Sequence, residues 1–130
     1  MPAMPSRISV LAIDAAQPRT VADFWCAVLG WQVVEVDEDG VSIAPSDGAA
    51  AGVGGLSIDV LQVPEAKAGK NRLHLDLRAD GTTTEQELER LLGLGARRVD
   101  VGQGPDVSWV VLADPEGNEF CLLSRTAQEV

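Results

Sequence analysis

The central segment of the chain alternates strictly between leucine and polar residues. Residues 70–78 read KNRLHLDLR, so that Leu73, Leu75 and Leu77 alternate with charged side chains and the only histidine, His74. A period of two is typical of a β-strand whose two faces meet different surroundings. The pattern predicts a strand over Arg72–Arg78, with an apolar face suited to a helix and a polar face opposite.

A first group of elements precedes this strand. Apolar residues at helical spacing predict an amphipathic helix over Pro18–Leu29, which Gly30 ends. Runs rich in β-branched and apolar residues predict strands at Arg7–Ile13, Trp31–Val36, Val41–Ala44 and Leu56–Val63. The Ala/Gly-rich segment Ser46–Gly55 is expected to be a loop.

The same order of elements begins again with the central strand. Thr84 and Glu87 fit a capping box at the start of a second helix, which reaches Leu94 and ends at Gly95. Further strands are predicted at Arg97–Val101, Ser108–Ala113 and Glu119–Leu123, with turns at Gly102–Asp106 and Asp114–Asn118.

The two groups form an internal repeat. The glycines that end the helices differ by 95 − 30 = 65 positions, an offset that sets Ser9 against His74. Each half reads strand, helix and three strands, which predicts an α+β fold of two tandem βαβββ modules, about 7–63 and 72–125, joined by a linker at 64–71. A half of about 60 residues buries little surface alone. The modules should therefore form one domain over residues 1–130, a curved mixed sheet with a central trough and helices outside.

The composition restricts the class of partner. A formal net charge of −10 over 130 residues argues against nucleic acid and anionic membranes, both of which require a basic surface. No apolar run approaches the roughly 20 residues of a membrane span. The first residues lack the features of a signal peptide, so we expect a cytoplasmic protein. In that compartment Cys26 and Cys121, the only cysteines, should be free thiols.

The polar face of the central strand carries the candidate chemistry. It brings Arg72, His74 and Asp76 to one side, where they either face plain solvent or line the trough. The leucine face is the one suited to a helix, which favours the trough. Phe24 and Trp25 lie on the apolar stripe of the first helix and, like Trp109, are expected in the core, whereas Trp31 fits the core and the trough equally.

Three segments together resemble the vicinal oxygen chelate superfamily, which includes glyoxalase I, extradiol dioxygenases and the bleomycin-resistance proteins. Residues 24–31 are similar to its aromatic-pair and Leu-Gly helix end, and residues 114–123 to its final hairpin. Residues 70–77 resemble an uncharacterised glyoxalase-like group. The resemblance implies the paired-module fold and a homodimer. It does not name a reaction, because the superfamily hosts many chemistries on one scaffold.

The resemblance also implies where a metal would bind. Metal-dependent members place one ligand on the first strand and one on the last strand of each module. His74 matches one of these positions, but its counterpart by the internal offset is Ser9, and Cys121 stands where the family has a glutamate. In Leu56–Val63, the oxygen donors are Asp59 and Gln62.

This ligand set is a poor match to an octahedral, oxygen-rich site. We therefore predict no cofactor and no standard metal site, with a divalent metal as the alternative. If a metal binds, the expected ligands are His74, Cys121 and Glu119.

Two functions follow from these observations. The first is a binding module that holds a small organic molecule in the trough; its expected ligand-binding residues are Ser9, Trp31, Gln62, Arg72, His74, Asp76 and Cys121. The second is a metal-dependent or metal-free lyase, isomerase or dioxygenase in which His74 is the catalytic base or a metal ligand.

Overall fold

A computed structural model describes residues 6–46, 55–100, 102 and 108–130. The chain divides into two compact units, Met1–Ala66 and Lys67–Val130, and each is described by itself. Most of the predicted loop at 46–55 and of the predicted turn at 102–106 lies outside the described residues. No helix in the described part of the chain is both long and apolar enough to cross a membrane.

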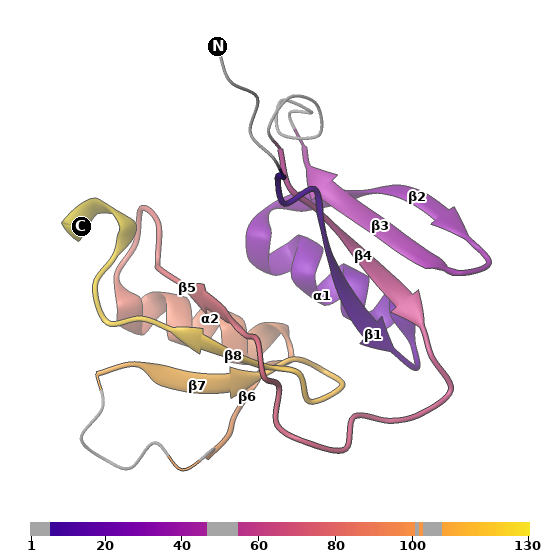
Figure 1. Cartoon of the computed structure of the whole chain (residues 1–130). Helices are drawn as coiled ribbons and strands as arrows, with labels where there is room; N and C mark the ends of the chain where they lie inside the picture. Colours follow the sequence, from indigo (N-terminus) through magenta and orange to yellow (C-terminus); the bar gives the residue numbers. More distant parts are fainter. Residues whose placement is uncertain (1–5, 47–54, 101, 103–107) are drawn as a thin grey trace. The chain divides into compact units, whose positions relative to one another are not determined.

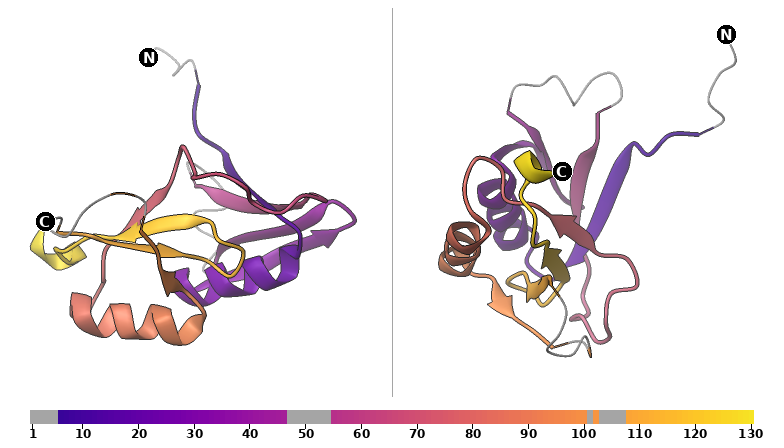
Figure 2. Two further views of the ribbon diagram at one scale, coloured as in Figure 1. Left: turned by 90° about the horizontal axis from the view of Figure 1, so that it is seen from below. Right: turned by 90° about the vertical axis from the view of Figure 1, so that its left-hand side faces the viewer.

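The first unit is a four-stranded mixed sheet with one helix. Its elements are β1 (Val10–Ala15), α1 (Pro18–Leu29), β2 (Trp31–Asp37), β3 (Gly40–Pro45) and β4 (Ser57–Gln62). The strand order is β1-β4-β3-β2, with β1 and β4 parallel and the other pairs antiparallel. Figures 1 and 2 show α1 lying along one face of this sheet.

Helix α1 follows the predicted bounds and buries the predicted aromatic residues. Pro18 occupies its first turn, and Gly30 ends it in the left-handed conformation at φ 70°, where its N–H donates to the carbonyl of Cys26 at 2.9 Å. Trp25 is 2% exposed and Phe24 is 4% exposed. Their rings pack edge to face, with the ring centroids 5.2 Å apart. The core positions predicted for these two residues are confirmed.

The second unit repeats the arrangement of the first. It contains β5 (Leu75–Leu77), α2 (Thr84–Leu94), β6 (Arg97–Arg98), β7 (Val110–Ala113), β8 (Glu119–Leu122) and a short 3₁₀ helix at Ala127–Glu129. The strand order is β5-β8-β7-β6, again with the first pair parallel. Helix α2 lies on one face of this sheet (Figures 1 and 2). The predicted α+β fold of tandem βαβββ modules is confirmed; the trough between them stays a prediction.

The cap of α2 differs from the prediction by one residue. The N-cap is Thr83, whose hydroxyl accepts a hydrogen bond from the backbone N–H of Gln86 at 3.1 Å. Glu87 does not reach back to the cap. Its carboxylate is instead bound by the Arg90 guanidinium at 2.8 Å, one turn further along the helix. The predicted capping box of Thr84 and Glu87 is therefore wrong.

The central strand is shorter than the alternation predicts. Strand β5 is an edge strand that pairs only with β8, from Leu75 opposite Phe120 to Leu77 opposite Leu122. Residues before Leu75 lie outside the described ladder, and Leu73 is 84% exposed instead of facing a helix. Alternation marks which residues share a face, but it does not set where backbone pairing begins.

A tight turn sets the start of β8, as predicted. The carboxylate of the fully buried Asp114 accepts hydrogen bonds from the backbone N–H groups of Glu116 at 2.9 Å and Asn118 at 3.0 Å. Gly117 supplies the positive φ of 91° that closes the turn. The turn therefore fixes the register in which the side chains of β8 are presented.

The two repeats match at their helix ends but are out of phase at their first strands. The more buried positions are odd-numbered in both strands, Leu11, Ile13 and Ala15 in β1 and Leu75 and Leu77 in β5. An offset of 65 would exchange odd and even positions and so exchange the faces. An offset of 79 − 15 = 64, which aligns Ala15 and Ala79, both almost fully buried, keeps the faces matched.

The counterpart of His74 is therefore Val10, since 74 − 64 = 10, and the predicted pairing of Ser9 with His74 is wrong. The helix ends still differ by 65, so one residue has been gained between the first strand and the end of the helix in the second repeat.

Candidate functional site

A row of side chains crosses the sheet of the second unit on the face turned away from α2. Asp76 of β5 pairs with Cys121 of β8, and Cys121 pairs with Val111 of β7. Their neighbours along the strands, such as Phe120 and Leu112, are at most 1% exposed and form the core. Because successive side chains of a strand point to opposite faces, the row Asp76–Cys121–Val111 belongs to the other face.

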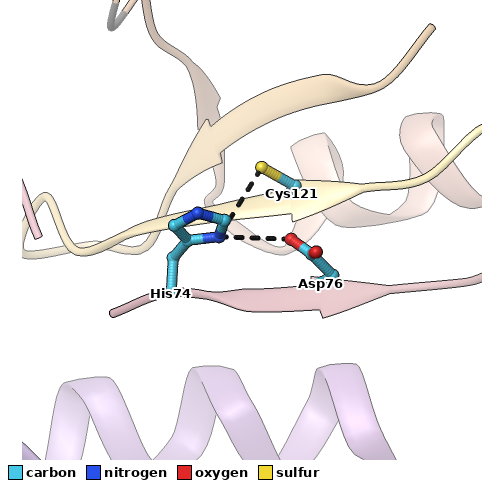
Figure 3. Close-up of side chains that lie close together, drawn as sticks. All are labelled: His74, Asp76 and Cys121. Atoms are coloured by element: carbon cyan, nitrogen blue, oxygen red, sulfur yellow. Dashed lines mark hydrogen bonds and ion pairs between the residues drawn. The ribbon is translucent and has the colours of Figure 1, made fainter. Parts of the chain in front are cut away.

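His74 joins this row from the residue just before β5. It lies two positions before Asp76, and its Nδ1 is 3.1 Å from the Asp76 Oδ1. The Cys121 Sγ is 4.0 Å from the same nitrogen, and one ligating atom from each of the three residues lies within 4.8 Å of the others. Figure 3 shows the three side chains converging from β8 and from the start of β5. We call them the His–Asp–Cys cluster.

The contact with Asp76 favours one tautomer of the neutral imidazole. A carboxylate only accepts hydrogen bonds, so the contact with Asp76 places a proton on the Nδ1 of His74. In the neutral ring the lone pair is then on Nε2, which Figure 3 shows on the side of the ring away from Asp76. The imidazole is thus oriented by a carboxylate and presents a base at its other nitrogen.

The thiol of Cys121 is held in its protonated form. Burial is the main cause that raises its pKa, and the negative charge of Asp76 and a hydrogen bond to that carboxylate raise it further, while Lys70 acts in the opposite direction. The side chain is also only 6% exposed. Because the thiolate is the reactive form, Cys121 is not an activated nucleophile.

The cluster lies in a cleft of about 360 Å³, a size that suits a small organic molecule. The lining combines the cluster with polar and apolar neighbours: Lys70, Asn71, His74, Asp76, Gly102, Trp109, Val111, Glu119, Cys121 and Leu123. Trp109 is 39% exposed and lines this cleft, so the core position predicted for it is wrong. It lies just before β7, two residues from Val111, which lines the same cleft.

Glu119 lies in the same cleft but is bound by other residues. Its carboxylate accepts hydrogen bonds from the Lys67 ammonium at 2.9 Å and from the Asn71 N–H at 2.9 Å. Burial acts to raise the pKa of Glu119, but these two donors outweigh it and the pKa lies below its usual range. Glu119 therefore anchors residues 67–71 to β8, while Asp76 is the carboxylate that joins His74 and Cys121.

The ligand-binding role expected of the other residues stays a prediction. Arg72 is exposed and does not line this cleft. Ser9, Trp31 and Gln62 belong to the first unit. There the Ser9 carbonyl accepts from the Ser57 N–H at 3.3 Å, and the Gln62 amide donates to the carbonyl of Ala16 at 2.7 Å. Trp31 begins β2 and is half-buried. The sequence-based list of ligand-binding residues lacks Lys70 and Asn71, which line the cleft. Their position directly before the predicted strand was the available signal.

The described residues of the first repeat form no matching cluster. By the offset of 64, the counterparts of His74 and Asp76 are Val10 and Ala12, and the strand partner of Ala12 is Asp59, as Cys121 is the partner of Asp76. Of these three counterparts only Asp59 can bind a metal. Its carboxylate already accepts a hydrogen bond from the Ser42 hydroxyl at 2.7 Å.

Comparison with solved structures shows the same fold at low sequence identity. The fosfomycin resistance protein FosX from Listeria monocytogenes, in complex with Mn(II) and sulfate, is 15% identical, with a TM-score of 0.67 over 97% of this chain and 95% of that chain. FosX from Mesorhizobium loti is also 15% identical, with a TM-score of 0.66 over 97% and 98% of the two chains.

A glyoxalase/bleomycin resistance protein/dioxygenase family enzyme from Burkholderia phytofirmans PsJN is 18% identical, with a TM-score of 0.61 over 90% and 97% of the two chains. No protein with a curated description matches the sequence. The model of the glyoxalase-like domain matches residues 10–123, which include both repeats. The chain therefore belongs to the glyoxalase-like domain family, within the vicinal oxygen chelate superfamily.

Proposed function

We propose that this protein binds a small organic molecule in the cleft of its second unit, with His74 as the polar anchor. The observation that carries the proposal is the orientation of the imidazole, whose Nδ1 is held by Asp76 at 3.1 Å while Nε2 keeps its lone pair. Polar groups placed in this way beside an apolar wall are typical of small-molecule sites.

The lining of the cleft indicates the class of ligand. Trp109, Val111 and Leu123 give it an apolar wall, and Lys70 supplies a cation near the cluster. A hydroxyl group of the ligand can donate to Nε2 of His74, and a carbonyl or carboxylate oxygen can accept from Lys70. The site thus suits a compact, partly apolar molecule that carries oxygen groups.

A metal-free lyase or isomerase is the second candidate function. A histidine whose Nδ1–H is fixed by a carboxylate is a suitable general base at Nε2. The cluster offers this arrangement in His74 and Asp76. The Burkholderia relative is described as an enzyme, and its fold is the same at 18% identity, which supports catalysis on this scaffold without naming the reaction.

The residues of the cluster do not fit a hard divalent ion such as the Mn(II) of the FosX structure. Such ions prefer oxygen ligands in octahedral geometry, whereas the cluster combines one carboxylate with an imidazole and a sulfur atom. The first repeat adds only Asp59, which Ser42 already engages. We therefore assign no step of a reaction to such an ion.

Ligand-detected NMR with a library of small carboxylic acids, ketones and phenols tests the proposal. With a chelator present, we expect fragments to bind the full chain and His74→Ala to weaken them by at least about tenfold, or 1.4 kcal/mol. Gln32→Ala, an exposed change in β2, should leave binding unchanged. Fragments that bind His74→Ala as tightly as the wild type would contradict the proposal. Conversion of a fragment, lost in His74→Ala, would establish the enzyme.

We also propose a cytoplasmic homodimer. The two free cysteines, Cys26 and Cys121, fit a reducing compartment. Each unit ends in edge strands, β1 and β2 in the first and β5 and β6 in the second, and open edges are commonly covered by association.

A further inference from the structure

We propose that the Asp80–Gly81 peptide is a site of isoaspartate formation, and that the segment after β8 controls the rate of this modification through Gln128. Asp80 and Gly81 are exposed in the loop between β5 and α2. An aspartate followed by glycine isomerises readily, because glycine has no side chain to shield its backbone nitrogen. Neither residue lines the cleft, so this inference does not rest on the proposed function.

The modification is an intramolecular exchange of bonds. The backbone nitrogen of Gly81 attacks Cγ of the Asp80 carboxyl group, so that a C–N bond forms, a C–O bond breaks and one water leaves with the amide proton. The resulting succinimide takes up one water at either of its two carbonyl carbons. Opening at the main-chain carbonyl carbon gives isoaspartate, in which the chain continues through the former side chain. No oxidation state changes, and water is the only co-reactant.

Both reacting groups are bound to one side chain. The N–H of Gly81 donates to Gln128 Oε1 at 2.9 Å, and Gln128 Nε2 donates to Asp80 Oδ1 at 2.5 Å. The amide of Gln128 therefore bridges the nitrogen that would attack and the carboxyl group that would be attacked. Because the nitrogen must turn away from Gln128 to reach Cγ, these hydrogen bonds have to open before the ring can close.

The segment of residues 124–129, which we call the C-terminal segment, holds Gln128 against this loop. Figure 1 shows it beside the loop between β5 and α2. Further hydrogen bonds join it to residues on both sides of Asp80: the Thr84 hydroxyl donates to the Ser124 carbonyl at 2.9 Å, the Arg78 guanidinium to the Arg125 carbonyl at 2.9 Å, and the Ala127 N–H to the Ala79 carbonyl at 2.8 Å. The position of the exposed Gln128 is thus fixed by its neighbours in the chain.

The product would change the start of α2. Isoaspartate adds one carbon atom to the main chain and leaves a free α-carboxylate, three residues before the N-cap Thr83. The loop then no longer has the length that matches the C-terminal segment. We therefore expect the Gln128 bridge to be lost once Asp80 is modified.

Another Asp–Gly pair, Asp39–Gly40, is protected by the sheet itself. The N–H of Gly40 donates to Asp37 Oδ1 at 3.1 Å, and Gly40 belongs to the β3–β4 ladder. Attack at Asp39 would require the end of β3 to leave the sheet, so this pair should react more slowly than the loop pair. A third pair, Asp47–Gly48, lies outside the described residues.

Incubation of the full chain at neutral pH, followed by digestion with trypsin and mass spectrometry, tests the proposal. Trypsin releases residues 79–90 as one peptide, which contains the loop pair and neither of the others. Electron-transfer fragmentation distinguishes isoaspartate from aspartate in this peptide. We expect Gln128→Ala to form isoaspartate about fivefold faster than the wild type or more, because the hydrogen bonds that hold the site closed are lost. Thr84→Val, which removes the bond to Ser124 and leaves both reacting residues intact, should give a smaller increase.

Two variants serve as controls. Gln32→Ala removes an exposed glutamine of β2 and should leave the rate unchanged. Asp80→Glu, added to Gln128→Ala, should stop the modification, because glutamate would have to close a larger ring. The proposal fails if either Gln128→Ala or Thr84→Val reacts at the wild-type rate, or if a free peptide of residues 79–90 reacts no faster than the wild-type chain. It also fails if the increase appears only in a variant that no longer unfolds cooperatively.

Discussion

The two nitrogens of His74 lie in different surroundings, and this asymmetry gives the residue its proposed role. Nδ1 contacts Asp76 and Cys121, both on paired strands, while Nε2 is turned away from them. The side chain of His74 is 41% exposed, so it contributes little to the packed core. A polar side chain in this setting is expected to serve a ligand more than the stability of the fold.

Replacement of His74 by alanine is therefore predicted to cost little stability. We expect the free energy of unfolding to fall by at most about 1 kcal/mol, as for a substitution outside the core. Leu122→Ala is the comparison, because Leu122 is fully buried in β8 and its truncation should cost about 2–5 kcal/mol. Urea unfolding of both variants measures the difference. Equal losses would make His74 a structural residue.

The individual residues also show how much of the site could be identified from the sequence. Period-two alternation placed His74 and Asp76 on one side, and the family resemblance pointed to Cys121; the structure brings these three together. Arg72 is expected with them because it shares their parity, but it lies three residues before β5, is exposed and does not line the cleft. The apolar neighbours of Trp109 predict a core position, whereas its side chain lines the cleft and is partly exposed.

At the scale of elements, Glu119 joins the segment before β5 to the start of β8. Its carboxylate accepts from Lys67 and from the backbone of Asn71, and Lys67 also donates to the carbonyl of Gly69. The side chains of Lys67 and Glu119 are 19% and 14% exposed, so this ion pair is largely shielded from solvent. Residues 67–71, which carry two lining residues of the cleft, are thus held by one carboxylate.

We predict that Glu119 makes stability sensitive to acid. Because its pKa is lowered in the folded chain, its contribution is fully present above the unfolded pKa of about 4.3 and is lost as the pH falls through the folded value. Glu119→Gln should lower the free energy of unfolding by about 1–3 kcal/mol at neutral pH. It should also flatten the decline of stability in acid.

Both effects are measured by denaturant unfolding of the wild type and Glu119→Gln. The series runs from neutral pH to the acid limit of folding, with a chelator present. Glu89→Gln, an exposed change on α2, should match the wild type at neutral pH. A Glu119→Gln variant with the acid dependence of the wild type would contradict the assignment of the anchor.

The helices follow the predicted bounds, and β2, β3, β4 and β8 do so to within one residue at each end. The other four strands, β1, β5, β6 and β7, differ by two residues or more at one end. Apolar spacing together with Gly30 and Gly95 gave the bounds of α1 and α2 as observed. Strand ends depend on a partner that is distant in the sequence: β6 was expected to reach Val101, but its described ladder is Arg97–Arg98. The capping box failed because three successive threonines precede α2, and spacing alone did not distinguish Thr83 from Thr84.

At the scale of the whole molecule, the described residues of the two repeats share a fold, and the His–Asp–Cys cluster lies in the second. Both halves share strand order and helix position, and these were predictable because each half repeats the same succession of apolar patterns. The phase between the repeats was not predictable. Glycines that end helices are easy to recognise in a sequence, whereas a gain of one residue between strand and helix is not. That single residue decides whether His74 is compared with Ser9 or with Val10.

The last prediction concerns the assembly of whole chains. Ile8 and Leu73 are 78% and 84% exposed, and each lies two residues before an edge strand, β1 and β5 respectively. Large apolar side chains beside unpaired strand edges favour association, and pairing of two chains would cover them. We therefore expect light scattering at tens of micromolar to give the mass of a dimer, about twice 13.7 kDa.

Lysine substitutions at the two exposed positions locate the contact. Ile8→Lys and Leu73→Lys place a charge where an apolar contact is expected, so at least one should shift the equilibrium toward monomer without a loss of cooperative unfolding. Val130→Lys is the matched control, because Val130 is another exposed apolar residue and stands at the C-terminus. This change should leave the mass unchanged. A wild-type chain that is monomeric over this concentration range would refute the homodimer. A dimer that survives both substitutions would place its contact at other surfaces, and the open edges of β2 and β6 would be the next to test.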